Sequence, residues 1–208
     1  RDLVRERAGG WRVNGESFDL VVSTVALNEL PALVPEMPAA AAAAMRGLAY
    51  NSIVTFLVAL DRPAHPSLSW IYLPHHEQGP VNRVTYMSNY SPELAPEGKS
   101  SFLFEVTFPG GASVPGAELE REALAGVEGA GLLRHEEVLF VDRSVCRYAY
   151  IVYDHHLYAR RAAALEWCRA NAVVPLGRFG RYDYFNSDQC VIAAREEAER
   201  IAVLARRG

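Results

Sequence analysis

Apolar positions along the chain follow the two-residue period of strands in some stretches and a helical period in others. A long β-branched stretch at 50–60 is followed by shorter ones at 70–73, 82–88 and 101–108, with proline and glycine between them. Connections this short favour an antiparallel meander. A further strand is expected at 137–148.

Helical spacing is clearest at 156–170, where Leu157, Ala164 and Cys168 recur at intervals near 3.6 residues. The same reasoning predicts further helices at 27–33 (with Asn28 as a candidate cap), at 39–46 before Gly47, at 118–127 and from about 187 to 204.

Short strands complete the pattern near both ends of the chain. Trp11–Val13 followed by Asn14 and Gly15 predicts a hairpin with a type I′ turn. Residues 18–25 (FDLVVSTV) are near-continuously apolar, which is typical of a strand buried on both faces, and 172–176 is a second short strand. The element order predicts an α+β fold, with an antiparallel sheet domain inserted between pieces of an α/β domain.

Composition narrows the function classes. The 208 residues carry a formal net charge of −4, so no basic surplus is available for a nucleic-acid backbone. The three cysteines form no C-x-x-C pair, which argues against a zinc ribbon or a disulfide scaffold. The adjacent histidines at 75–76 and 155–156 are interpreted as surface residues, not metal ligands. No apolar run is long enough to span a bilayer, and a cytoplasmic location is expected.

The strongest chemical signal is the segment 176–189, L-G-R-F-G-R-Y-D-Y-F-N-S-D-Q, where a short strand passes through glycines into the last helix. Glycines allow close backbone approach, Arg178 offers a forked cation, and a helix start presents free N–H groups. These features suit a diphosphate or an electron-rich ring. A plain strand–turn–helix connection with solvated arginines is the alternative.

This segment resembles the carboxy-terminal flavin-binding signature of the FAD-dependent amine-oxidase-like flavoproteins, and within them the UDP-galactopyranose mutase branch. The resemblance implies an FAD cofactor. The residues that it places at the cofactor are Gly177, Arg178, Gly180, Asn186 and Asp188.

A second stretch supports the same family. Residues 69–105 contain S-W-I-Y-L-P, N-R-V-T-Y-M-S-N-Y-S-P and F-E-V, which look like the substrate domain of mutase-like proteins. The resemblance implies that 1–47 holds partial FAD-domain strands and helices, that 48–150 forms the substrate sheet domain, and that 151–208 is the closing FAD-domain segment.

Three of the candidate substrate residues can also be argued from their positions. Trp70 and Tyr72 share a strand face and would make an aromatic platform, unless both are core residues. Arg83 would need an anion, either a substrate diphosphate or a structural carboxylate. The resemblance favours the diphosphate, with hydroxyls lent by Tyr90, Tyr150 and Tyr184.

The dinucleotide fingerprint G-x-G-x-x-G is absent from these 208 residues. The chain alone is therefore expected to bind FAD weakly or not at all, to be inactive by itself, and to need a missing amino-terminal FAD-binding half as partner. The resemblance implies mutase-type chemistry on a nucleotide-sugar. Flavin oxidation of an amine or carbon centre is the enzymatic alternative, and a non-catalytic remnant or binding module is the third reading.

Overall fold

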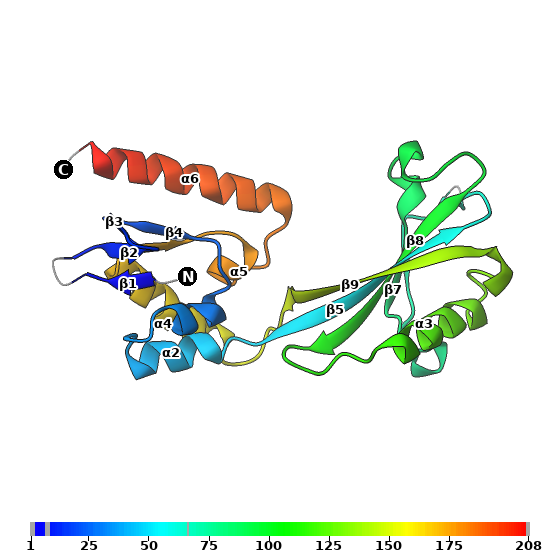
Figure 1. The fold of residues 1–208 in the computed structure, drawn as a ribbon, viewed down its shortest axis with the longest axis horizontal. Helices are drawn as coiled ribbons and strands as arrows, with labels where there is room; N and C mark the ends of the chain where they lie inside the picture. Colours follow the sequence, from blue (N-terminus) through cyan, green and yellow to red (C-terminus); the bar gives the residue numbers. More distant parts are fainter. Residues whose placement is uncertain (1–2, 7–8, 66, 207–208) are drawn as a thin grey trace. The chain divides into compact units, whose positions relative to one another are not determined.

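A computed structural model describes residues 3–6, 9–65 and 67–206, and its chain divides into two compact units. Unit 1 comprises residues 1–50 and 150–208, and unit 2 comprises residues 51–149. The expected α+β class is confirmed, since unit 1 contains a parallel strand pair between helices and unit 2 contains a mostly antiparallel sheet (Figure 1).

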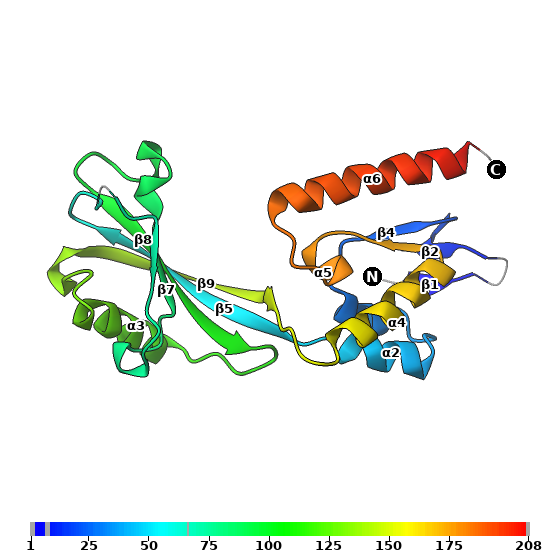
Figure 2. The ribbon, with the colours of Figure 1, turned by 180° about the vertical axis from the view of Figure 1, so that it is seen from behind.

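Unit 1 is built around two parallel strands that are far apart in the sequence. β4 (Val21–Ser23) pairs in parallel with β10 (Val173–Pro175). Long helix α6 lies on one side of this pair and α2 and α4 lie on the other (Figures 1 and 2). The helices of the unit are η1 (Leu27–Glu29), α1 (Leu30–Leu33), α2 (Ala39–Arg46), α4 (Leu157–Ala170), α5 (Arg178–Arg181) and α6 (Ser187–Ala205).

A small antiparallel sheet of three strands completes unit 1: β1 (Leu3–Arg5), β2 (Trp11–Val13) and β3 (Glu16–Phe18). Asn14 and Gly15, between β2 and β3, both have positive φ (49° and 95°), as a type I′ turn requires. The indole of Trp11 is fully buried, and its Nε1 donates to the carbonyl oxygen of Asn171 at 2.7 Å. This bond ties the small sheet to the end of α4.

The expected long strand at 18–25 is wrong in both length and burial. Phe18 ends β3, and β4 covers only Val21–Ser23. The side chain of Val22 is 47% exposed, because the described part of the sheet gives β4 a single neighbour, β10. Asn28 is also not a cap: η1 begins after Ala26 without a side-chain cap hydrogen bond.

Unit 2 is a five-stranded sheet in the order β6-β7-β8-β5-β9 (Figure 1). The pairs β6–β7 and β7–β8 are antiparallel, as the short connections predicted. The expected meander is wrong for β5, which pairs with the distant strand β8, also antiparallel, and not with β6, which follows it in the sequence. The bounds are β5 (Tyr50–Leu60), β6 (Trp70–Tyr72), β7 (Arg83–Tyr86), β8 (Ser100–Pro109) and β9 (Val138–Ile151), with short helices η2 (His76–Gln78), η3 (Met87–Asn89), η4 (Pro92–Leu94) and η5 (His135–Glu137).

One face of this sheet is covered by α3 (Ala117–Gly129). Phe56, Phe102 and Phe104 on that face join Leu119 and Val127 of the helix in one buried cluster. The strand residues between them belong to the opposite face, which α3 does not cover. Three of the candidate substrate residues, Trp70, Tyr72 and Arg83, lie on that second face.

Candidate functional site

Parallel strands β4 and β10 end side by side, and the glycine–arginine segment begins where β10 ends. The N–H of Leu176 donates to the carbonyl oxygen of Ser23 at 2.8 Å, which holds the two strand ends together. In open α/β sheets, ligands bind in the crevice beyond the carboxyl ends of such strands. The sequence-predicted cofactor segment therefore begins at the edge where a ligand is expected.

Gly177 and Gly180 are glycines for different reasons. Gly177 has φ 81° and ψ 171°, a region that is essentially reserved for glycine, and a Cβ there would meet no atom within 4 Å. Gly180 has ordinary φ, but its Cβ would lie 3.3 Å from the carbonyl oxygen of Ser23. Backbone conformation thus fixes the first glycine, and close packing of α5 against the end of β4 fixes the second.

Arg178 lies against two tyrosine rings. Its guanidinium carbon is 4.0 Å from the ring centroid of Tyr184 and 5.4 Å from that of Tyr150. Both distances fall within the range of cation–π attraction. Its Nε and Nη2 atoms are buried without a hydrogen-bond partner among the described residues. Buried guanidinium nitrogens are normally hydrogen-bonded, so these two donors suit a ligand that supplies acceptors.

The rings around Arg178 extend into a larger aromatic group. Tyr153 lies 6.4 Å from Tyr184 and 6.4 Å from Tyr158, measured between ring centroids. All three side chains are at least 48% exposed. The sequence pointed to Tyr150 and Tyr184 only as substrate residues. Their contacts show that both also border the candidate cofactor arginine, and Tyr153 and Tyr158 were not anticipated.

Asp183 anchors the segment that follows. Its carboxylate accepts a hydrogen bond from Arg161 of α4 and lies 3.8 Å from Nε of Arg181. Arg161 also donates to the carbonyl oxygen of Arg181 at 2.9 Å. The side chain of Tyr182 is buried and donates to the carbonyl oxygen of Leu48 at 3.0 Å; burial raises the pKa of this phenol. These bonds hold the chain in place immediately after Arg178.

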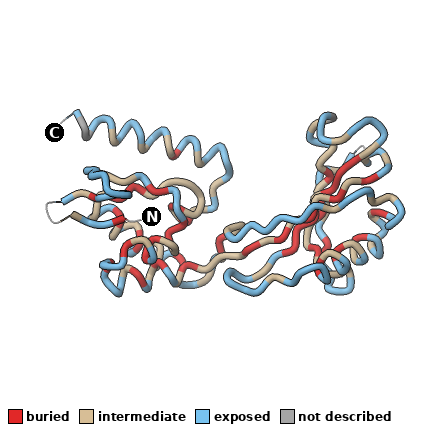
Figure 3. Tube along the Cα trace, viewed as in Figure 1, coloured by how far each residue is buried: buried red, intermediate tan, exposed pale blue. Residues whose placement is uncertain are grey.

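Asn186 and Asp188 lie at the exposed start of α6. The backbone N–H of Asn186 donates to Oε1 of Gln189 at 2.8 Å, which is half of a capping box. No described contact links either residue to Arg178. Figure 3 shows how little of α6 is buried beyond this point.

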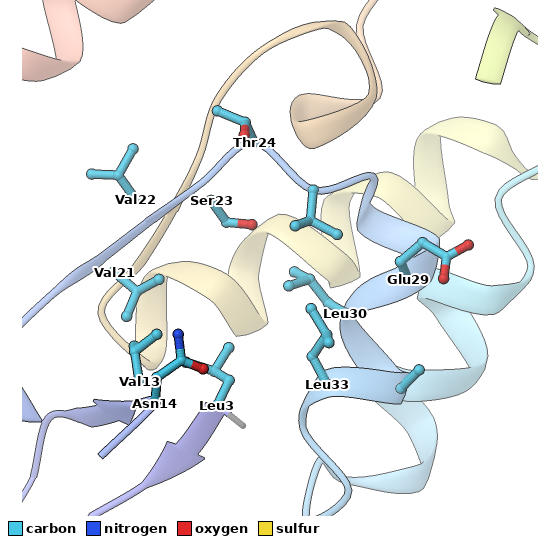
Figure 4. A pocket seen from close by; sticks show the side chains of 12 residues that line it. Leu3, Val13, Asn14, Val21, Val22, Ser23, Thr24, Glu29, Leu30 and Leu33 are labelled. Atoms are coloured by element: carbon cyan, nitrogen blue, oxygen red, sulfur yellow. The ribbon is translucent and has the colours of Figure 1, made fainter. Parts of the chain in front are cut away.

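A mainly apolar pocket of about 440 Å³ adjoins the end of β4 (Figure 4). Its walls come from Leu3 and Val13 of the small sheet, from the 21–25 segment, and from Leu30 and Leu33 of α1. Ser23 and Val25 line this pocket, and their carbonyl oxygens also lie within 4 Å of the position that a Cβ on Gly180 would occupy. The pocket and the glycine–arginine segment thus share one stretch of chain.

The second face of the unit 2 sheet carries the other candidate residues. Strand register places Tyr72 opposite Arg83 and Arg83 opposite Glu105, so that they form one row across β6, β7 and β8. Trp70, two residues before Tyr72 on the same face of β6, is 50% exposed, and Tyr72 is 61% exposed. The two aromatics are therefore surface residues on one face, and the alternative of two core aromatics is excluded.

Arg83 has a partner that the sequence reading did not assign. Its Nε donates to Oε1 of Glu105 at 3.1 Å, and Nη2 makes a further contact with the same oxygen. Glu105 is only 4% exposed. An acidic residue within the apolar strand F-L-F-E-V-T-F was the available signal, since a buried carboxylate calls for a cation. The strand expected at 82–88 is shorter: β7 ends at Tyr86, and Met87 begins η3.

Tyr90 ends η3 and is 56% exposed, and no described contact joins it to Arg83. No group of three or more histidine, cysteine, aspartate or glutamate side chains within the described residues could hold a metal ion. Over that same part of the chain, no helix is both long and apolar enough to cross a membrane.

Comparison with known proteins decides the family. A family model of flavin-containing amine oxidoreductases matches residues 2–128. The chain belongs to this family. No curated protein sequence matches the chain.

Several solved structures share the fold of this chain. A reduced UDP-galactopyranose mutase matches 92% of the chain with a TM-score of 0.81 and 23% identity. A putative protoporphyrinogen oxidase from Exiguobacterium sp. matches 98% of the chain, with a TM-score of 0.76 and 17% identity. A fatty acid isomerase from P. acnes matches 96%, with a TM-score of 0.65 and 12% identity. This chain covers only 43% to 46% of the length of these three proteins.

Proposed function

We propose that this chain is the carboxy-terminal portion of an FAD-dependent enzyme and that Arg178 is its principal contact with the coenzyme. The observation that carries the proposal is the pair of buried guanidinium nitrogens of Arg178 without a hydrogen-bond partner among the described residues. FAD offers the acceptors that such donors need, on its diphosphate and on its pyrimidine ring. The family match supports the same coenzyme independently.

The residues around Arg178 fit this coenzyme. Gly177 lets the chain turn at the end of β10 without a side chain over the crevice, and Gly180 seats α5 against β4. Asn186 and Asp188, at the start of α6, are the further proposed contacts. When bound, FAD supplies redox chemistry that protein side chains lack. The remaining contacts to its dinucleotide portion are assigned, within this proposal, to polypeptide outside these 208 residues.

For the substrate we propose a nucleotide-sugar, bound on the second face of the unit 2 sheet. Trp70 and Tyr72 are two residues apart on one face of β6 and offer exposed ring surface, which suits stacking against a base or a sugar. Arg83 lies beside Tyr72 in the same row, and Glu105 fixes the direction of its guanidinium. Tyr90, Tyr150 and Tyr184 are the proposed sources of hydroxyl groups.

In this proposal, different residues bind the coenzyme and the substrate. Arg178 and its neighbours bind and orient the coenzyme, while the aromatic platform and Arg83 bind and orient the substrate. Mutase-type chemistry on the sugar is the reaction we favour. An amine substrate would bring a cation and no diphosphate, and would gain nothing from Arg83.

The substrate proposal is tested by binding. Calorimetric titration with UDP-galactose on the product of the complete reading frame should give a saturable signal that Tyr72→Ala weakens by roughly tenfold, the loss expected for one stacked ring. Phe140→Ala removes an equally exposed ring from β9 and serves as the matched control. Turnover of simple amines, together with no detectable nucleotide-sugar binding, would replace this proposal with amine oxidation.

A further inference from the structure

A second cavity in unit 1 is lined by arginines from three different helices. It has a volume of about 520 Å³ and runs beside β10. Arg169 comes from the last turn of α4, Arg181 from α5 and Arg200 from α6. The described residues that line it are all different from those that line the pocket at the end of β4.

The charges around this arginine cavity do not balance. Glu197 is the sole carboxylate among its described lining residues, and it lies 2.7 Å from Nε of Arg200. Arg181 shares the carboxylate of Asp183 with Arg161, at a distance of 3.8 Å. Arg169 makes no ion pair or side-chain hydrogen bond with any described residue. Three cations on one cavity wall, with one carboxylate among them, create a field that attracts an anion.

The rest of the lining is apolar. Leu20, Leu165, Val174 and Pro175 provide hydrocarbon surface beside the guanidinium groups. The volume falls within the range of about 300–1,000 Å³ that small-molecule sites occupy. A guanidinium group can donate two parallel hydrogen bonds to two oxygens of one phosphate. An inorganic anion would leave the apolar surface uncovered, so the cavity fits an anion that carries an organic group.

We propose that the arginine cavity binds a small organic phosphate monoester. Its phosphate contacts Arg169 and the adjacent arginines, and its organic group packs on Leu20, Val174 and Pro175. This site is separate from the proposed coenzyme site and does not depend on it. It gives unit 1 a second anion site, with the different task of recognising a phosphorylated small molecule.

Phenyl phosphate is a suitable probe, because its ring tests the apolar wall and its phosphate tests the arginines. Isothermal titration of the 208-residue chain at low salt should show saturable binding. Arg169→Gln should weaken it by roughly tenfold or more, as the loss of a charge-assisted hydrogen bond predicts. Arg195→Gln removes an exposed arginine of α6 outside the cavity and should leave the affinity unchanged. Inorganic phosphate and benzoate should each bind several-fold more weakly than phenyl phosphate.

Arg200→Gln provides a second test should Arg169→Gln fail to fold, which circular dichroism would reveal. Absence of saturable phenyl phosphate binding, or equal affinity in the parent and both cavity variants, overturns the proposal. Binding that disappears in Arg178→Ala but survives in Arg169→Gln also overturns it, since the probe would then occupy the coenzyme site. That last result would leave the proposed function standing.

Discussion

The guanidinium carbon of Arg178 lies 4.0 Å from the centre of the Tyr184 ring, while two of the guanidinium nitrogens are buried without a hydrogen-bond partner among the described residues. The ring compensates part of the positive charge but offers no lone pairs to the N–H groups. The arginine side chain is therefore held in position, but two of its hydrogen-bond donors lack acceptors among the described residues. Arg178 should therefore matter more to a ligand than to the stability of the fold.

The first prediction separates these two roles. In the absence of FAD, Arg178→Met should change the free energy of unfolding by less than about 1 kcal/mol, because the ring contact that it loses is offset by removal of two unsatisfied buried donors. Urea unfolding followed by circular dichroism measures this. A loss of several kcal/mol would show that the arginine is mainly structural.

A second prediction concerns the turn before Arg178. Gly177→Ala should destabilise unit 1 by roughly 1–3 kcal/mol, because alanine is strained at φ 81° and ψ 171° even though its methyl group meets no atom. Gly129→Ala is the control: this glycine of α3 lacks a left-handed φ and has free space around it. An unchanged unfolding midpoint for Gly177→Ala would contradict the assignment.

A third prediction follows from Cys168. Burial raises the pKa of this thiol to about 12, so the folded protein retains the proton after the unfolded chain has lost it. The contribution of Cys168 to stability is therefore complete below pH 9 and is lost as the pH rises toward 12. The slope of this loss is at most about 1.4 kcal/mol per pH unit.

Cys168→Ala should remove this part of the pH dependence between pH 9 and 10, as measured by urea unfolding. In the native protein a thiol reagent at pH 8 should modify exposed Cys146 and leave Cys168 untouched. Rapid modification of Cys168 without unfolding would show that α4 opens more readily than its packing implies.

The fourth prediction concerns the ion pair on the unit 2 sheet. Arg83→Met should destabilise unit 2 by roughly 3 kcal/mol, because it leaves the buried carboxylate of Glu105 without its cation. Adding Glu105→Gln to the Arg83→Met variant should restore most of the lost stability, because it removes the buried charge that Arg83 had neutralised. A double variant no more stable than Arg83→Met alone would argue against the pairing as the source of the effect.

Much of the fold could be predicted because it depends on local pattern. The β5 strand has the expected bounds, 50–60, since its alternating residues have hydrogen-bonded neighbours on both sides in β8 and β9. The 18–25 stretch shows the limit of such reasoning. Its composition fits a fully buried strand, but burial depends on neighbours in space, and β4 pairs only with β10 in the described chain.

The candidate site was predictable to a similar degree. The glycine–arginine motif located Arg178, since strand, turn and helix are consecutive there. Tyr150 lies against Arg178, and Tyr153 lies against Tyr184. Both tyrosines are more than twenty residues before Arg178 in the sequence, so only the fold could place them there. The pairing of Arg83 with Glu105 likewise depends on the register of β7 against β8, which no local pattern specifies.

FAD binding through Arg178 is tested most directly by a flavin titration. The product of the complete reading frame should be yellow as purified, and the Kd for FAD, measured by quenching of flavin fluorescence, should rise by roughly tenfold or more in Arg178→Ala, the cost of at least one charge-assisted hydrogen bond. Arg195→Ala, on the exposed surface of α6, should bind FAD as the parent does. Equal FAD affinity in Arg178→Ala and the parent would contradict the account.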